Sequence, residues 1–123
     1  MRRILATLTV VGALLFSAGS AWADFDDGLA AYQRGDYATA LQEWRLLAEQ
    51  GYAVAQSDLG FMYREGEGVP QNDAEALKWY SLAKAQGSDA AAHNLDIIQK
   101  QMTPTQIDEA QKLAAEWWEE HNN

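Results

Sequence analysis

Residues 52–87 read YAVAQSDLGFMYREGEGVPQNDAEALKWYSLAKAQG, and the order of segments in this stretch decides the fold. Two runs have apolar residues recurring at spacings of three and four, which is typical of amphipathic helices. Between them lies an acidic segment, residues 63–73, that contains two glycines and a proline, as connectors often do. The stretch therefore predicts two antiparallel helices, at about residues 52–65 and 73–86, joined by a loop.

This helix pair has a counterpart earlier in the chain. Residues 40–51, ALQEWRLLAEQG, match residues 76–87, ALKWYSLAKAQG, at a spacing of 36. Residues 32–35 match residues 63–66 at a spacing of 31, so the connector of the later unit is five residues longer. Internal repeats of about this length indicate stacked helical units that share one continuous core.

A third unit begins after Gly87, because residues 91–95 lie 36 positions beyond residues 55–59. Thr103 is placed as an N-cap, Pro104 as the first helical residue and Gln106 as the partner that completes a capping box. We interpret the helix that follows as a terminal helix covering the open end of the array. The predicted helices are residues 25–34, 37–50, 52–65, 73–86, 88–101 and 104–120, forming pairs at about residues 25–51, 52–87 and 88–120.

No segment alternates apolar and polar residues in the way of a strand, so the predicted fold class is all-α. It is a short α/α solenoid of about three antiparallel helix pairs. Asp36 and Asp73 are predicted to cap the second helix of their pairs, and Gly51 and Gly87 to end helices in the left-handed conformation. The residues expected in the close contacts and in the space between pairs are Ala40, Ala76, Tyr32, Tyr63, Leu46, Leu82 and the tryptophans.

The chain contains no cysteine, so disulfides cannot stabilise it. Burial of an aromatic side chain removes about 150–250 Å² from water, at roughly 25 cal/mol per Å². We expect this burial to replace the cross-links that small exported domains generally use.

Residues 1–23 have the organisation of a signal peptide. Arg2 and Arg3 precede an apolar run at residues 4–16, and Ala21 and Ala23 place small residues before a cleavage point. A membrane anchor is the alternative, but the apolar run is shorter than the roughly 20 residues of a spanning helix. We therefore expect export by the general secretory route to the periplasm, with secretion as an alternative, and a repeat domain at residues 24–123 that has no stable membrane insertion.

The predicted mature part is strongly acidic. It carries seven basic residues against eighteen acidic ones, a formal charge of 7 − 18 = −11. Nucleic acid binding is disfavoured, because it depends on lysines and arginines that neutralise phosphates. The same charge favours a protein or peptide partner with a basic segment.

Residues 52–87 resemble one complete Sel1-like repeat. The matching positions are Ala55, Leu59, Gly60, Tyr63, Gly66, Gly68, Val69, Asp73, Ala76, Trp79, Tyr80 and Gly87. The first unit has the short connector of a tetratricopeptide repeat, and the third keeps the first-helix half, with Asp96 at the family's glycine position. The resemblance, to the exported bacterial type, implies an α-solenoid adaptor that binds proteins or peptides on a concave surface lined by the first helix of each pair.

A few cysteine-rich members of this family are reported to bind or hydrolyse penicillins, and their cysteines are missing here. Ser57, Ser81 and Ser88 lack the Gly-x-Ser-x-Gly elbow, and His93 and His121 are the only histidines. Glu65 and Glu67 lack the acidic ligand spacing of a calcium loop. We therefore expect no catalytic residue, metal or cofactor.

The candidate partner-binding surface follows from helical periodicity. If Leu59 and Tyr63 face the helical partner, the neighbouring stripe of the same helix belongs to the concave surface. The candidate residues there and on the corresponding stripe of the third unit are Ser57, Asp58, Phe61, Arg64, His93, Asn94 and Ile97. Phe61 and Ile97 either complete the core or anchor a partner.

The predicted function is a non-enzymatic interaction scaffold or adaptor in the bacterial envelope. The alternatives are a cell-wall-related enzyme or penicillin-binding protein, and a structural subunit of an envelope complex. The sequence favours no particular oligomeric state.

Overall fold

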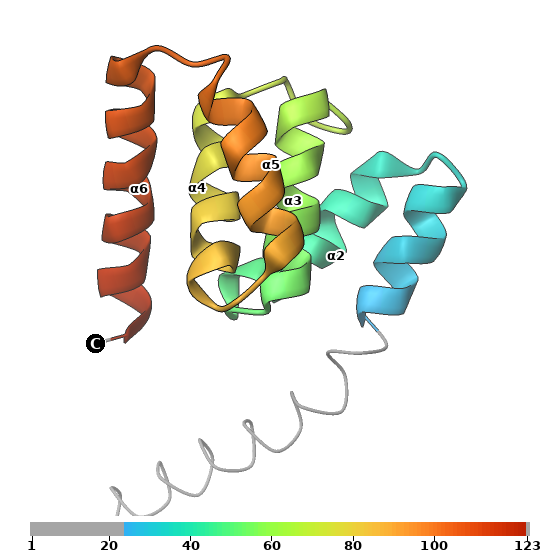
Figure 1. Ribbon diagram of the computed structural model, residues 1–123. Helices are drawn as coiled ribbons and strands as arrows, with labels where there is room; N and C mark the ends of the chain where they lie inside the picture. Colours follow the sequence, from blue (N-terminus) through green and yellow to red (C-terminus); the bar gives the residue numbers. More distant parts are fainter. Residues whose placement is uncertain (1–23, 123) are drawn as a thin grey trace, which may run out of the picture.

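The computed structural model describes residues 24–122, and within them it contains helices and no strand (Figure 1). The predicted signal peptide lies outside the described residues. A helix occupies residues 24–33, followed by α2 (Tyr37–Glu49), α3 (Ala53–Glu65), α4 (Asp73–Ala85), α5 (Asp89–Gln99) and α6 (Pro104–Asn122). The predicted all-α solenoid is confirmed, and each predicted helix boundary lies within two residues of the observed one.

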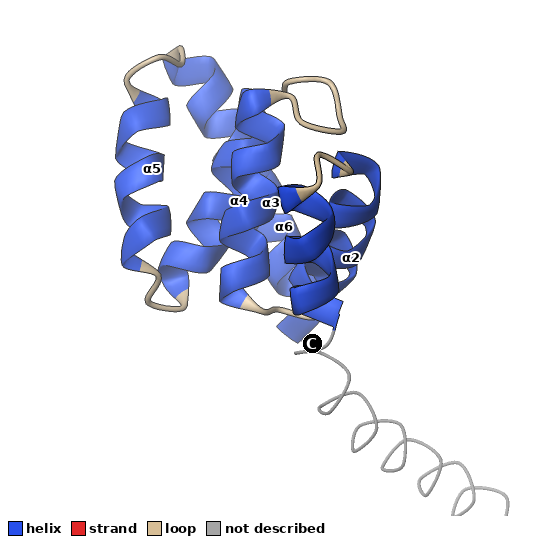
Figure 2. Ribbon diagram, turned by 90° about the vertical axis from the view of Figure 1, so that its right-hand side faces the viewer, coloured by secondary structure: helices blue, strands red, loops and turns tan. Residues whose placement is uncertain are grey.

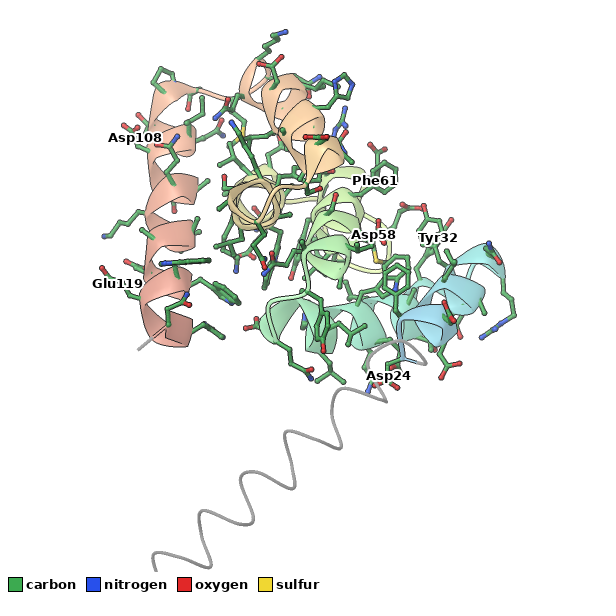
Figure 3. The ribbon with its side chains drawn as sticks, turned by 60° about the horizontal axis from the view of Figure 1, so that its bottom comes forward. Asp24, Tyr32, Asp58, Phe61, Asp108 and Glu119 are labelled. Carbon is green, nitrogen blue, oxygen red and sulfur yellow. The ribbon has the colours of Figure 1, made fainter. Side chains whose placement is uncertain are left out.

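The helices form two rows. The 24–33 helix, α3 and α5 lie on one side, and α2, α4 and α6 lie on the other (Figure 3). Of the helices α2 to α6, α3 packs most extensively on α2 and α4, while α4 also contacts α5 and α6. Helix α4 is therefore the central element, and α3, α5 and α6 pack around it (Figure 2).

The third pair differs from the prediction, because α6 packs mainly against α4 rather than against α5. Trp79 of α4 and Trp117 of α6 meet edge to face, with ring centroids 5.9 Å apart. The small side chains of Ala110 and Ala114 are buried on the same face of α6 and allow the close approach. The terminal helix thus extends the row of α2 and α4 and packs beside α4.

The contact between α3 and α4 is closest at Gly60. A Cβ atom added to Gly60 would lie 2.9 Å from two ring carbons of Tyr80 and 3.2 Å from the carbonyl oxygen of Ala76. Tyr80 and Ala76 are both fully buried. Glycine is therefore required here by the proximity of the tyrosine ring, and it sets the distance between the two helices.

The connector between α3 and α4 packs on the first unit. Gly66 ends α3 in the left-handed conformation, at φ +70°. Gly68 has φ +75°, and a Cβ there would lie 3.0 Å from the carbonyl oxygen of Tyr37. The side chain of Val69 packs against the core cluster, as predicted. The two glycines and the valine therefore allow the connector to pack against the first unit.

Glu67 in this connector holds the 24–33 helix. The Tyr32 hydroxyl donates to Glu67 Oε1 at 2.9 Å and is 3.1 Å from Oε2. Burial, followed by this hydrogen bond to a carboxylate, raises the pKa of Tyr32 to about 12. No role for Glu67 was predicted, since its partner lies 35 residues away in the sequence.

The predicted helix N-caps are observed, with one exception. Asp36 accepts from the Thr39 N–H at 3.3 Å, and this hydrogen bond lowers the pKa of the carboxyl group. The predicted Thr103 and Gln106 capping box forms both of its bonds, at 3.2 and 2.9 Å. The prediction for Asp73 was wrong, because Asn72 is the N-cap and accepts from the Glu75 N–H at 3.1 Å. Asp73 is instead the first helical residue, where its charge still favours the positive end of the helix dipole.

Two predicted core residues are exposed. Leu46 is 56% exposed while the adjacent Leu47 is 2% exposed, because a step of one residue turns a side chain about 100° around the helix. Trp118 is 45% exposed beside the buried Trp117, for the same reason. The predicted left-handed conformation of Gly51 and Gly87 is confirmed, at φ +94° and +96°.

Replacement of Gly60 by alanine tests the close approach of α3 and α4. Alanine ordinarily stabilises a helix relative to glycine by about 1 kcal/mol. Here we expect the opposite, a loss of roughly 1–3 kcal/mol, because the new methyl group overlaps the Tyr80 ring. Urea denaturation of Gly60→Ala and of the control Ser57→Ala, on the same helix, measures this. A Gly60→Ala protein as stable as the wild type would show that the two helices are not in tight contact.

Candidate partner-binding surface

The row formed by the 24–33 helix, α3 and α5 is curved. In Figure 3, α3 is set back from the line that joins the 24–33 helix to α5, so the three helices form a concave side, called here the inner face. Phe61 and Asp58 point from α3 toward this side, and Tyr32 of the 24–33 helix points toward Asp58. The inner face therefore combines side chains from separate repeat units.

The seven predicted site residues lie on α3 and α5 and outside the buried core clusters. Phe61 and His93 are exposed, while Ser57, Asp58, Arg64, Asn94 and Ile97 are partly buried. Within residues 24–122, no hydrogen bond or ion pair joins the α3 members to the α5 members. Phe61 is 37% exposed and does not complete the core, whereas Ile97 lies beside the fully buried Ile98.

A residue missed at the sequence level extends this surface. Val54 is 60% exposed and precedes Asp58 by four positions on α3, while Phe61 follows Asp58 by three. Side chains at these spacings lie on one stripe of a helix. Helical periodicity alone could have identified Val54, because position 54 continues the stripe that contains Asp58 and Phe61.

Asp58 is the half-buried charge in the middle of this stripe. Burial raises the pKa of its carboxyl group to about 6. No ion pair or hydrogen bond to its side chain is formed within residues 24–122, and the Arg64 guanidinium on the same helix lies 3.8 Å from Glu65. A carboxylate that is partly removed from water without a partner is energetically unfavourable. Asp58 therefore presents an uncompensated negative charge to the inner face.

Tyr80 lies behind this stripe. It is fully buried, and its hydroxyl has no hydrogen-bond partner within residues 24–122. Burial raises the pKa of Tyr80 to about 12, an effect that Arg64 opposes and that Glu65 and Asp58 reinforce. Tyr32 and Tyr80, the neighbours of Asp58 on the 24–33 helix and on α4, are therefore neutral phenols, and neither donates a hydrogen bond to its carboxylate.

A separate cavity of about 270 Å³ lies between the ends of α2 and α6. One carboxylate oxygen of Glu49 accepts from Trp117 Nε1 at 3.0 Å and lies 3.3 Å from His121 Nε2. The His121 ring stacks on Trp117 at a centroid distance of 3.9 Å, and its Nδ1 lies 2.8 Å from the Trp117 carbonyl oxygen. These contacts hold the last turn of α6 to α2 and give His121 a structural role.

Two further observations concern the described part of the chain. Residues 24–122 contain no group of three or more His, Cys, Asp or Glu side chains placed to hold a metal ion. None of the helices in that range is both long enough and apolar enough to cross a membrane.

Comparison with known proteins agrees with the helical-repeat fold. The family model for the Sel1 repeat matches residues 53–88, which are α3, the connector, α4 and the turn that follows. The chain is a Sel1-like repeat protein. A similar architecture is seen in the crystal structure of a protective antigen present in uropathogenic Escherichia coli strains, which displays an SLR fold. That match has a TM-score of 0.79 and 29% sequence identity, and it covers 85% of this chain and 24% of the antigen.

Among curated proteins, this Sel1-like repeat protein is similar to two named exopolysaccharide production negative regulators, from Rhizobium leguminosarum and Rhizobium meliloti. Each is 36% identical over 70 residues, which is 57% of this chain and 26% of the relative. An Arabidopsis thaliana F-box protein is 35% identical over 77 residues, covering 63% of this chain and 21% of that protein. The chain therefore spans about a quarter of the length of the relatives it matches.

Replacement of Asp58 by asparagine tests the uncompensated charge. Because the folded-state pKa is about 6 and the ordinary value is 3.8, the ionised form destabilises the fold. Stability should be lowest above pH 6 and should rise as the pH falls toward 4, where Asp58 is protonated in the folded state. We expect Asp58→Asn to stabilise the protein at neutral pH by on the order of 1–2 kcal/mol, and the gain to disappear near pH 4.

Urea denaturation at the two pH values measures this difference. Asp96→Asn is the matched control, because Asp96 is 70% exposed on α5. A loss of stability in Asp58→Asn at neutral pH would show that the carboxylate is compensated.

Proposed function

We propose that this Sel1-like repeat protein is a non-enzymatic adaptor that binds a segment of a partner protein on its inner face. The observation that carries the proposal is the α3 stripe, where Val54 and Phe61 are exposed on either side of the unpaired Asp58. Apolar side chains in a concavity, next to a polar group that is not satisfied within the fold, are features of a binding site.

The family relationship supports a binding role. Sel1 repeat proteins generally mediate protein–protein interactions, and this repeat fold is typically a non-enzymatic scaffold. Two of the relatives are named as negative regulators of exopolysaccharide production and a third as an F-box protein. The similarity covers about a quarter of each relative, which suits a shared module rather than a shared reaction.

The proposed site of action is the bacterial envelope, with the periplasm as the compartment. This part of the proposal depends on the signal-peptide pattern of residues 1–23. We expect cell fractionation to recover the protein from the periplasm, and N-terminal sequencing of the recovered protein to begin at Asp24. An intact N-terminus in the cytoplasm would contradict export and would leave the binding role of the inner face to be decided separately.

Photo-crosslinking in intact cells tests the proposed binding surface. A photoreactive residue placed at position 54 should form a discrete adduct with one partner, and the same residue at position 112 should not, because Lys112 is exposed on α6, a helix of the other row. Phe61→Ala should reduce the adduct and the measured affinity for the identified partner by about tenfold, the effect of truncating an interface anchor. The control Lys112→Ala should change neither. Equal adducts from the two positions, or full binding by Phe61→Ala, would rule out the inner face as the site.

A further inference from the structure

We propose that Asp58 receives a lysine or arginine side chain of the partner segment, and that Val54 and Phe61 hold apolar side chains on either side of it. This inference rests on the proposed function of the inner face and adds the chemistry of the partner. The partner segment would carry a basic residue with an apolar residue two positions away on each side.

The spacing of the stripe fits such a segment. With a rise of 1.5 Å per helical residue, the four positions from Val54 to Asp58 span about 6 Å and the three from Asp58 to Phe61 about 4.5 Å along α3. Alternate residues of an extended chain lie on one side and are about 6.6 Å apart. An extended segment along α3 can therefore present apolar, basic and apolar side chains in turn to these three positions.

The charges around Asp58 favour a cation from outside the fold. Tyr32 on the 24–33 helix and Tyr80 on α4 are neutral phenols, and Glu67 accepts the Tyr32 hydrogen bond. On α3 itself, Arg64 lies beside Glu65. A charge pair in a partly desolvated site interacts more strongly than one in open water, so a partner cation gains from the burial that makes Asp58 unfavourable alone.

The same environment makes the interaction dependent on pH. Burial raises the pKa of Asp58 to about 6, so the carboxylate is charged at pH 7.5 and mostly protonated at pH 5. Protonation removes the attraction to a cationic side chain. Binding should therefore weaken as the pH falls through about 6.

The test is selection from a random peptide library displayed on phage, with the purified protein, Asp58→Asn and Phe61→Ala as parallel targets. We expect peptides selected by the wild type to be enriched in the motif of one basic residue between two apolar residues. Those selected by Asp58→Asn should keep the apolar residues and lose the basic one. Basic enrichment that persists on Asp58→Asn, or its absence on the wild type, would overturn the inference.

The outcomes also separate this inference from the proposed function. Apolar peptides that require Phe61 but show no basic preference would leave the inner face as the binding site and remove the role of Asp58. A failure to select any peptide that depends on Phe61 would contradict the proposed function itself.

A peptide from the wild-type selection then gives the pH dependence. Its affinity should fall about tenfold between pH 7.5 and pH 5, in proportion to the ionised fraction of Asp58, and should be constant on Asp58→Asn. The measurement is repeated in His93→Gln as a control, because His93 is the one histidine among the candidate residues of this surface. A fall of the same size on Asp58→Asn would overturn the assignment of the pH effect to Asp58.

Discussion

The close contact between Gly60 and Tyr80 is the constraint on which the rest of the structure depends. With no side chain at Gly60, the tyrosine ring lies directly against the backbone of α3. This fixes α3 on α4, and α4 is also the helix on which α5 and α6 pack. A larger residue at position 60 would separate the helices at the centre of the array, and the curvature of the inner face would change with them.

With α3 fixed in this way, one side of the helix is buried in the core and the other side is exposed. Ala55, Leu59 and Met62 are fully buried in the core, while Val54 and Phe61 remain exposed. Asp58 lies at the boundary between these sides, where burial raises the pKa of its carboxyl group and no partner is present within the described residues. A residue that costs stability without serving the core is characteristic of a functional surface, and this is why Asp58 is central to the proposed binding.

Most of the fold could be predicted because its signals are local. The 36-residue repeat, Gly51 and Gly87 after α2 and α4, and the capping box at Thr103 all depend on neighbouring residues. Where the sequence offers two adjacent residues of the same kind, only packing distinguishes them. Leu46 and Leu47 both suit a buried helix face, and Asn72 and Asp73 both suit an N-cap.

The candidate site could be predicted only in outline. Helical periodicity placed Asp58 and Phe61 on one stripe of α3, as the structure shows, but Val54 was missed. The bond between Tyr32 and Glu67 and the packing of α6 on α4 join segments far apart in the sequence. Such contacts have no local signal, and the absence of a partner for Asp58 becomes visible only once all of its neighbours are in place.

The central claim is that the inner face of α3 is the binding surface, and chemical-shift mapping tests it most directly. Backbone amide resonances would be followed while the captured partner segment is added to the isotopically labelled protein. We expect the largest changes at Val54, Asp58 and Phe61, with smaller ones at Asn94 and Ile97 on α5. Changes concentrated on α6 or on the outer side of α2, with the α3 stripe unaffected, would contradict it.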